Sequence, residues 1–391
     1  MIGSRLRQYR LARGLSMEEL VAAMGGLVTK QSLSKYERDR STPAPSVLRS
    51  LSRALGVEAA RLLEEQAVEV EICAYRKKAR MGRKEMARIE SLTSVSLTDR
   101  VRLDDALGLT PVGADALPSV EVEAVEDTEG AADSVRSLWG LGEDPIACVL
   151  DTLEEHHIHV VEVDASDAFD GMSAVALTPK REKLAAAVVV RKGLPGERQR
   201  LGLTHELGHL VLDVSDAVDA EKAAFRFGAA LLAPAEAVHR EVGERRRRID
   251  LQELLLLKKR YGLSIQALLY RLRDLQIITE SQYKSACIEI NRLGWRREEP
   301  MPLPPERPTW LRQNVLRAVS EGAMGTAEGE RMLGEAFDEK PALSLMQRRS
   351  LMAMSVDERR RHLKEQAERI VADYHPDADW SAASGEDIVE Y

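Results

Sequence analysis

The 391-residue sequence contains few aromatic residues, few cysteines and no long apolar run. Aromatic residues make up only 4% of the chain, which favours helices packed through alanine and leucine. No stretch approaches the roughly eighteen apolar residues that a membrane helix needs, and the basic first residues lack the apolar core of a secretory signal. The three cysteines are odd in number and far apart, which argues against a disulfide framework or a cysteine-type zinc site. We therefore expect a cytoplasmic protein with no membrane partner.

Charge is unevenly distributed along the chain. The formal net charge is −8, yet residues 1–57 hold ten basic and four acidic residues, a net of about +6. A small basic unit on an acidic chain indicates local contact with a polyanion such as nucleic acid. Residues 118–133 have the opposite bias, with six acidic residues and no lysine or arginine. We interpret that stretch as a solvated linker or mobile loop near a domain boundary.

Short helical patterns fill the basic N-terminal stretch. One of them begins with Ser16 and carries Glu19 three residues later, which is the spacing of a capping box. Helices this short are not stable alone, so we expect them to share one apolar core. The predicted helices cover residues 2–12, 16–24, 29–37 and 46–55. The predicted core contains Leu6, Leu20, Leu33, Leu48 and Leu51.

From about residue 134 the pattern becomes mixed α/β. Residues 158–164 and 183–191 are rich in β-branched residues and predict two strands. Amphipathic spacing predicts helices over 144–157, 196–214 and 219–234, and two more around Gly262. No internal repeat is present.

Residues 203–214 read LTHELGHLVLDV and hold two of the eight histidines of the chain. On a helix, His205 and His209 would share one face, and two imidazoles at this spacing can bind one Zn²⁺. Glu206 would lie about 100° around the axis, where its carboxylate could exchange a proton with a metal-bound water. The alternative is a pair of core histidines. The position of the motif, after two strands and before another helix, favours zinc.

Such a site needs a third protein ligand and an open fourth position. The best candidate is Glu221, because a short turn between antiparallel helices would return it to the histidines. Another histidine-rich stretch, EEHHIH at 154–159, falls where a predicted helix ends, and cationic side chains suit a helix C-terminus. We expect no metal there. Weaker candidates for the third ligand are Asp213, Asp216 and Asp219, and His239 is a candidate for an outer role.

The stretch RQRLGLTHELGHLVLD, followed by EKAAFRFGAALLAP, resembles the ImmA/IrrE family of zinc metallopeptidases over roughly residues 145–310. The resemblance implies zinc held by His205, His209 and Glu221, with Glu206 as general base and acid. It also implies limited proteolysis, often of a helix-turn-helix repressor, in response to stress or mobile-element signals. Phe225, Gly228 and Ala233 stand where the family commonly has Asn or Asp, Ala, and Met. None of these departures removes a ligand, and substrate choice stays open.

The N-terminal sequence resembles the Cro/XRE (xenobiotic-response-element) helix-turn-helix family over nearly its whole length, including RGLSMEELVAAM and LSKYE. The resemblance implies that a helix at about 30–37 enters the major groove of operator DNA. Because one such domain binds weakly, we expect a homodimer on a palindrome. The alternative is a bundle used only for protein contacts. The candidate DNA-binding residues are Thr29, Lys30, Gln31, Ser32, Ser34, Lys35, Arg38 and Arg40.

The C-terminal segment 351–391 combines a charged helical pattern with a tryptophan and an apolar-acidic end. It either packs on its own protein or binds a partner. The segment resembles short bacterial antitoxins that wind over a toxin, often a PIN-domain ribonuclease. The residues that would bind such a partner are Arg359, Gln366, Tyr374, Trp380, Ile388 and Tyr391.

These observations predict a multidomain, mainly α protein with an α+β zincin-like peptidase domain and an N-terminal bundle of four to five helices. The expected parts are a helix-turn-helix DNA-binding domain (1–66), a helical connector with an acidic linker (67–133), a zinc metallopeptidase domain (134–310), a helical extension (311–350) and an antitoxin-like tail (351–391).

Three functional hypotheses follow. The first is a DNA-binding transcriptional regulator that cleaves a regulator protein, or itself at a linker such as 118–133, in a stress-response or toxin–antitoxin locus. The second is a non-proteolytic regulator whose site is a scaffold or is covered by the proline-rich stretch 299–308. The third is a repressor and antitoxin that neutralises a toxin through its tail. We expect the protein to be nucleoid-associated when bound to DNA.

Overall fold

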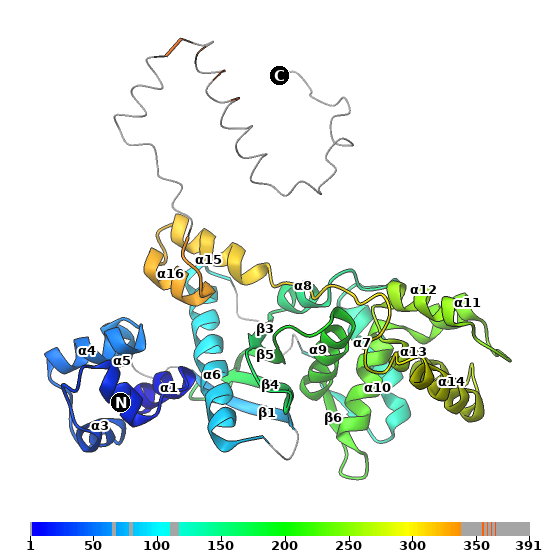
Figure 1. Ribbon diagram of the computed structural model, residues 1–391, viewed down its shortest axis with the longest axis horizontal. Helices are drawn as coiled ribbons and strands as arrows, with labels where there is room; N and C mark the ends of the chain where they lie inside the picture. Colours follow the sequence, from blue (N-terminus) through cyan, green and yellow to red (C-terminus); the bar gives the residue numbers. More distant parts are fainter. Residues whose placement is uncertain are drawn as a thin grey trace. The chain divides into compact units, whose positions relative to one another are not determined.

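The computed structural model describes residues 2–64, 68–77, 81–109 and 117–337, together with residues 354, 355, 358, 361 and 364. Residues Met1–Glu335 form one compact unit and Ala336–Tyr391 a second. The prediction of a multidomain, mainly α protein is confirmed, and the structure adds a small mixed sheet (Figure 1). No helix in the described part of the chain is long and apolar enough to cross a membrane.

The N-terminal helices share one core, as the short patterns predict. Ser16 and Glu19 form the expected capping box, because each side chain accepts the backbone N–H of the other residue. Leu6, Leu20, Leu33 and Leu51 are completely buried, whereas Leu48 is only partly buried at the edge of the cluster. The helices are α1 (Ile2–Ala12), α2 (Met17–Ala23), α3 (Lys30–Glu37), α4 (Pro45–Leu55) and α5 (Ala59–Leu63).

The connector after the bundle is only partly helical. It forms strand β1 (Glu69–Lys77) and then the long helix α6 (Arg83–Ala106). The strand arises because apolar and acidic residues alternate at its start, with Val70 facing the core below α6. Helix α6 also packs against α1.

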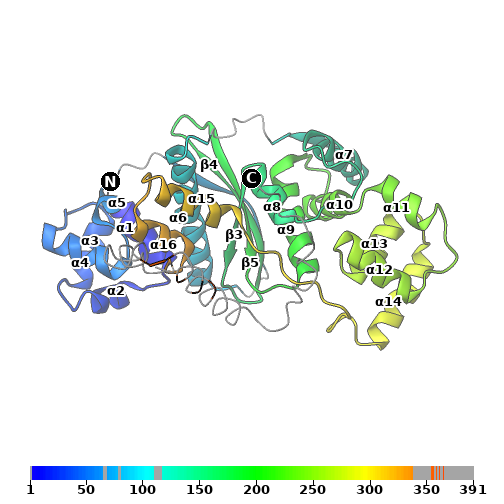
Figure 2. The same ribbon diagram turned by 90° about the horizontal axis from the view of Figure 1, so that it is seen from above.

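The main sheet has the strand order β1-β4-β5-β3. Strands β3 (Ile158–Val163) and β5 (Lys183–Arg191) confirm the two predicted strands and run parallel, whereas β4 (Phe169–Leu177) runs antiparallel to β5 and to β1. Helix α6 covers one face of the sheet, and α8 (Val149–Glu155) and α9 (Gly196–Val211) lie on the other (Figures 1 and 2). Two separate apolar clusters fill these faces.

The acidic stretch 118–133 is not a solvated linker, which corrects the prediction. It holds strand β2 (Val120–Val122), a 3-10 turn η2 (Val125–Asp127) and the start of α7 (Thr128–Leu138). Strand β2 pairs in parallel with β6 (Leu212–Val214), and β6 begins where the predicted α9 was expected to continue. The acidic residues are tolerated because they alternate with apolar ones and several have partners within the fold.

The proline-rich stretch 299–308 packs against the start of helix α9. The proline-rich stretch is fixed to the first turn of α9: the Gly196 N–H donates to the Leu303 carbonyl (2.9 Å), and the Leu303 N–H donates to the Glu197 carboxylate (3.0 Å). These contacts place it about two helical turns before His205, so it is not a lid on the histidines. The remaining helices are α10 (Ala220–Leu232), α11 (Ala235–Val242), α12 (Leu251–Tyr261), α13 (Ile265–Asp274), α14 (Glu280–Arg292), α15 (Trp310–Ser320) and α16 (Thr326–Leu333).

Candidate metal centre

Helix α9 carries the two histidines on one face. Its buried leucines Leu203 and Leu207 pack in the main core, and this packing fixes the rotation of the helix. His205 and His209 are one turn apart, and their Nε2 atoms are 3.1 Å from each other. His205 is completely buried, whereas the side chain of His209 is 11% exposed. The pair therefore opens toward solvent on the side of His209.

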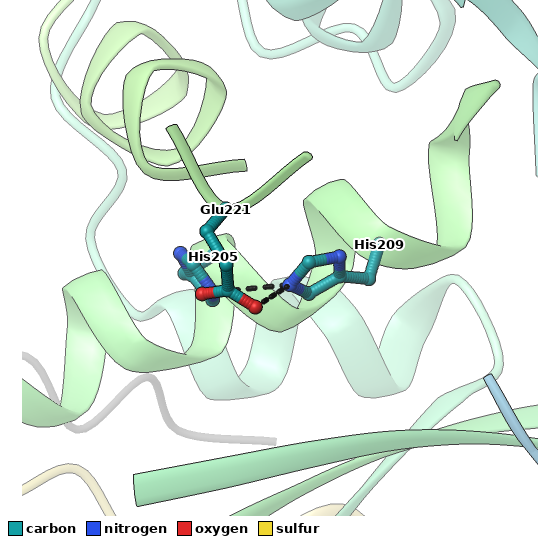
Figure 3. A group of neighbouring side chains, drawn as sticks. All are labelled: His205, His209 and Glu221. Atoms are coloured by element: carbon teal, nitrogen blue, oxygen red, sulfur yellow. Dashed lines mark hydrogen bonds and ion pairs between the residues drawn. The ribbon is translucent and has the colours of Figure 1, made fainter. Parts of the chain in front are cut away.

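Helix α10 brings Glu221 to the same point (Figure 3). The carboxylate of Asp219 caps this helix by accepting the Lys222 N–H, so Glu221 lies in its first turn. One carboxylate oxygen of Glu221 is 3.4 Å from Nε2 of His205, and the other is 3.4 Å from Nε2 of His209. The structure thus brings the three predicted ligands together, and they are the one group of this kind in the described residues.

Two glycines allow α9 and α10 to approach closely. A Cβ atom on Gly208 would lie 3.1 Å from the Cα of Ala224, and one on Gly228 would lie 3.0 Å from the backbone nitrogen of His205. Distances this short are rarely tolerated next to backbone atoms. Gly228 therefore allows the close packing of α10 against α9 in this chain, although the family commonly has alanine at this position.

The far end of α10 is fixed by two buried arginines. Arg136 donates to the carbonyl of Leu231, and Arg271 donates to the carbonyl of Ala233 (3.0 Å). Arg271 also forms an ion pair with Glu129 of α7. These contacts satisfy C-terminal carbonyls of the helix. They set the direction in which α10 presents Glu221.

The donor set fits a tetrahedral zinc ion. Ligand atoms at about 2.0–2.1 Å from zinc lie about 3.3 Å apart at tetrahedral angles, close to the 3.1 and 3.4 Å separations here. Burial, and then the charges of Arg76 and His209, lower the pKa of His205 to about 2. Burial also lowers the pKa of His209. Both imidazoles are therefore neutral near pH 7, the form in which they bind metals.

Glu206 is completely buried beside the three ligands. Neither carboxylate oxygen has a hydrogen-bond partner, and the nearest cation is Arg76, whose Nε is 3.7 Å from Oε1. Strand β4 makes room for it at Gly171, because a Cβ atom there would overlap the carboxylate. Burial raises the pKa of Glu206 to about 8, although Arg76 acts in the opposite direction.

Two residues around the centre, Arg76 and Gly171, were not predicted from the sequence. Arg76 on β1 lies with its Cζ 5.2 Å from the ring centre of Phe225, and the Phe225 ring centre is 4.1 Å from that of His205. Gly171 gives Glu206 its space. Both lie far from the HELGH motif in sequence, and no local pattern singles them out. Phe225 was noted only as a departure from the family pattern.

The weaker metal candidates are not part of the group. Asp219 is the N-cap of α10, and His239 lies 3.5 Å from Glu244. In the EEHHIH stretch, His156 stacks on Trp139 and His159 is buried 3.4 Å from Asp104. Asp213 lies in β6, and Asp213 and Asp216 are exposed.

The candidate DNA-binding residues lie on and next to α3. Thr29 is its N-cap and accepts the Ser32 N–H (3.1 Å), and Lys30 forms an ion pair with Glu18. Ser32 and Ser34 are half-buried. Contact of this surface with DNA remains a prediction. The exposed members are Thr29, Lys30, Gln31, Lys35, Arg38 and Arg40.

The candidate partner-binding residues of the tail lie outside the described residues. These are Arg359, Gln366, Tyr374, Trp380, Ile388 and Tyr391.

Two regions of the chain match family models. Residues 6–62 match a helix-turn-helix model, and residues 153–273 match the M78 peptidase model, described as an IrrE N-terminal-like domain. The M78 family is a family of zinc metallopeptidases. Neither match reaches the tail, so the resemblance to antitoxins gains no support from it. Among curated proteins, no match was found. The chain therefore carries a helix-turn-helix domain of the DNA-binding type and an IrrE-like domain of the M78 peptidase family.

Proposed function

We propose that this protein is a DNA-binding transcriptional regulator whose second domain is a zinc-dependent endopeptidase. The observation that carries the proposal is the convergence of His205, His209 and Glu221 beside the buried Glu206. Core histidines without a metal would have no need for a carboxylate from a second helix at tetrahedral spacing.

The chain's own residues can perform peptide hydrolysis. When bound, zinc would act as a Lewis acid that polarises the scissile carbonyl and makes a water molecule more acidic. Glu206 then takes a proton from the attacking water and returns it to the nitrogen of the leaving amine. Burial raises the pKa of Glu206, which strengthens its carboxylate as a base toward the attacking water. The absence of a side chain at Gly171 leaves the space that this carboxylate occupies.

The helix-turn-helix domain would direct the protein to an operator. Helix α3 would lie in the major groove, where Gln31 can pair with adenine. Arg38 and Arg40 are exposed beyond its end, where they suit phosphate contacts. We infer a homodimer on a palindromic operator. The substrate would be a regulator protein or this chain, in a stress-response or toxin–antitoxin locus. The toxin–antitoxin setting rests on the resemblance of the tail alone.

The test compares the purified wild-type chain with Glu206→Gln, using labelled casein as an unfolded protein substrate and the intact mass of the chain as a second readout. General acid–base groups contribute about 10²–10⁴-fold to rate, so we expect Glu206→Gln to lose at least a hundredfold in cleavage while keeping its metal. The matched control is Glu280→Gln, in the exposed first turn of α14. Equal cleavage by Glu206→Gln and wild type would rule out the proposed role.

A further inference from the structure

Strand β1 lies at the edge of the sheet that borders the candidate metal centre. It pairs antiparallel with β4, and β4 is the strand whose Gly171 adjoins Glu206. Residues 69–77 also lie outside the matched M78 region, 153–273. Without β1, strand β4 would be the edge of this sheet and would present unpaired N–H and C=O groups.

An extended polypeptide is the form of substrate that such an edge would take. Peptides bind to exposed strand edges by adding a strand, with main-chain hydrogen bonds giving affinity. At β4 an added strand would pass beside Glu206 and the three candidate ligands. In this structure β1 already occupies that position, with Arg76 paired to Gly171 in the register.

The side chain of Arg76 reaches into the centre from β1. Its Nη2 would be 3.9 Å from a Cβ atom on Gly202 of α9, its Nε is 3.7 Å from Glu206, and its guanidinium lies over the ring of Phe225. One basic side chain thus follows the surface of α9 to the proposed catalytic carboxylate and covers it.

Strand β1 is paired on one side only, because it is an edge strand of the sheet. The register with β4 shifts around Cys73 and again at Lys77, which interrupts the ladder. Ile72 is 36% exposed, and the Glu71–Arg181 ion pair lies in solvent, where such pairs contribute about 0–1 kcal/mol. Tyr75 is one of the apolar anchors of the strand, with its ring meeting that of Phe169 edge-on at 5.9 Å between centroids.

We propose that residues 69–77 are a resident pseudosubstrate, which occupies the peptide-binding edge of β4 and covers Glu206 with Arg76. The site then accepts another extended polypeptide only after β1 leaves. This inference rests on the proposed function, because it assigns the substrate-binding edge of that same site.

The experiment measures binding of a fluorescein-labelled peptide with the sequence of residues 68–80, by anisotropy, to the full chain in a chelator, where no metal-dependent cleavage occurs. In the Tyr75→Asp variant, a bound β1 would hold a carboxylate against the apolar ring of Phe169. Because burying a charge there is unfavourable, the variant should favour release of β1 from β4. We expect this variant to bind the peptide at least tenfold more tightly than wild type and than the control Tyr270→Asp, in which a 43%-exposed tyrosine is changed. A peptide carrying Arg76→Ala should bind more weakly.

Hydrogen exchange provides the second readout. We expect the amides of 69–77 to exchange at least tenfold faster in Tyr75→Asp, with those of β4 and β5 unchanged. Unchanged peptide affinity in a folded Tyr75→Asp chain would overturn the inference, as would joint loss of protection in β1, β4 and β5. If Tyr75→Asp does not fold, the same two measurements are made on the Arg76→Ala variant. Faster exchange confined to residues 69–77, together with tighter peptide binding, would support the inference. No change in either measurement would overturn it. The zinc content of the chain, measured separately, distinguishes this inference from the proposed function. A chain that binds zinc but never binds the peptide would contradict the pseudosubstrate role of β1 and leave the proposed metal centre intact.

Discussion

The helix-turn-helix bundle and the α9–α10 pair present their functional groups in opposite ways. On α3 the candidate DNA-contacting side chains such as Gln31 and Lys35 are exposed, and the leucine core beneath only positions them. On α9, His205 and Glu206 are themselves 0% exposed. A surface site needs only a correctly placed helix, whereas a buried polar site removes polar groups from water at a cost that the surrounding structure must offset.

This difference explains why buried charge pairs surround the second region. Lys258 of α12 lies 2.8 Å from Glu197 at the start of α9 and also pairs with Glu299. Arg271 pairs with Glu129 and holds the end of α10. These pairs fix the two helices that carry the candidate ligands. The bundle has a buried pair of its own, Arg10 with Glu37, but this pair is away from the exposed face of α3.

The largest expected effect comes from breaking one of these pairs. Lys258→Met would leave the buried Glu197 and the half-buried Glu299 without their cation, and removal of one partner of a buried pair typically lowers the free energy of unfolding by about 3–5 kcal/mol. Urea denaturation would measure it. The adjacent Lys259 is exposed, so Lys259→Met should stay within about 0.5 kcal/mol of wild type. Equal losses from the two variants would contradict the role given to the buried pair.

On the exposed region, we expect an effect on binding without one on folding. After operator selection from random DNA, Gln31→Ala should reduce discrimination at one base pair by about 1–3 kcal/mol. Arg38→Gln should weaken binding to all sequences and reduce the salt slope by about one. Both should keep the wild-type melting temperature. A base preference that survives Gln31→Ala would show that another residue makes the contact.

The close approach of α9 and α10 can be tested at a glycine. Gly228→Ala places a methyl group 3.0 Å from the backbone nitrogen of His205, and such overpacking typically lowers the free energy of unfolding by about 1–3 kcal/mol. It should also weaken zinc binding. Gly130 in α7 has nothing within 4 Å, so Gly130→Ala should raise stability by about 0.5–1 kcal/mol. A neutral Gly228→Ala variant would show that the helices can separate freely.

The smallest expected effect concerns pH. Burial lowers the pKa of His159 below its usual 6.5, so the unfolded chain takes up a proton there before the folded chain does. This histidine therefore makes stability fall as the pH drops below about 6.5, by up to about 1.4 kcal/mol per pH unit. Unfolding of His159→Gln, followed between pH 7 and 5, should show a flatter dependence than wild type. An identical slope would mean that His159 does not contribute.

The sequence predicted those parts that depend on local spacing. The capping box at Ser16 and the apolar spacing gave the short N-terminal helices. The HELGH pattern and the carboxylate at the start of the next helix gave the three candidate ligands. Each of these signals lies within a few residues of the feature it determines. Strands β3 and β5 were also visible, because they are buried and rich in valine.

The rest depends on contacts between distant segments. Strand β4 has small residues and Gly171, whose purpose appears only when Glu206 is placed against it. Strand β1 was overlooked beside the basic run that follows it, so Arg76 had no assigned neighbour. The acidic bias of 118–133 indicated a linker, because composition does not show that Glu129 meets Arg271 from α13.

The most direct test of the account is the zinc content of the purified chain, measured by plasma mass spectrometry after dialysis. We predict about one zinc per chain for wild type and for the control Glu280→Ala, and almost none for Glu221→Ala, with all three chains folded. A folded wild-type chain without zinc, or a Glu221→Ala variant that keeps it, would contradict the assignment of His205, His209 and Glu221 as a metal centre.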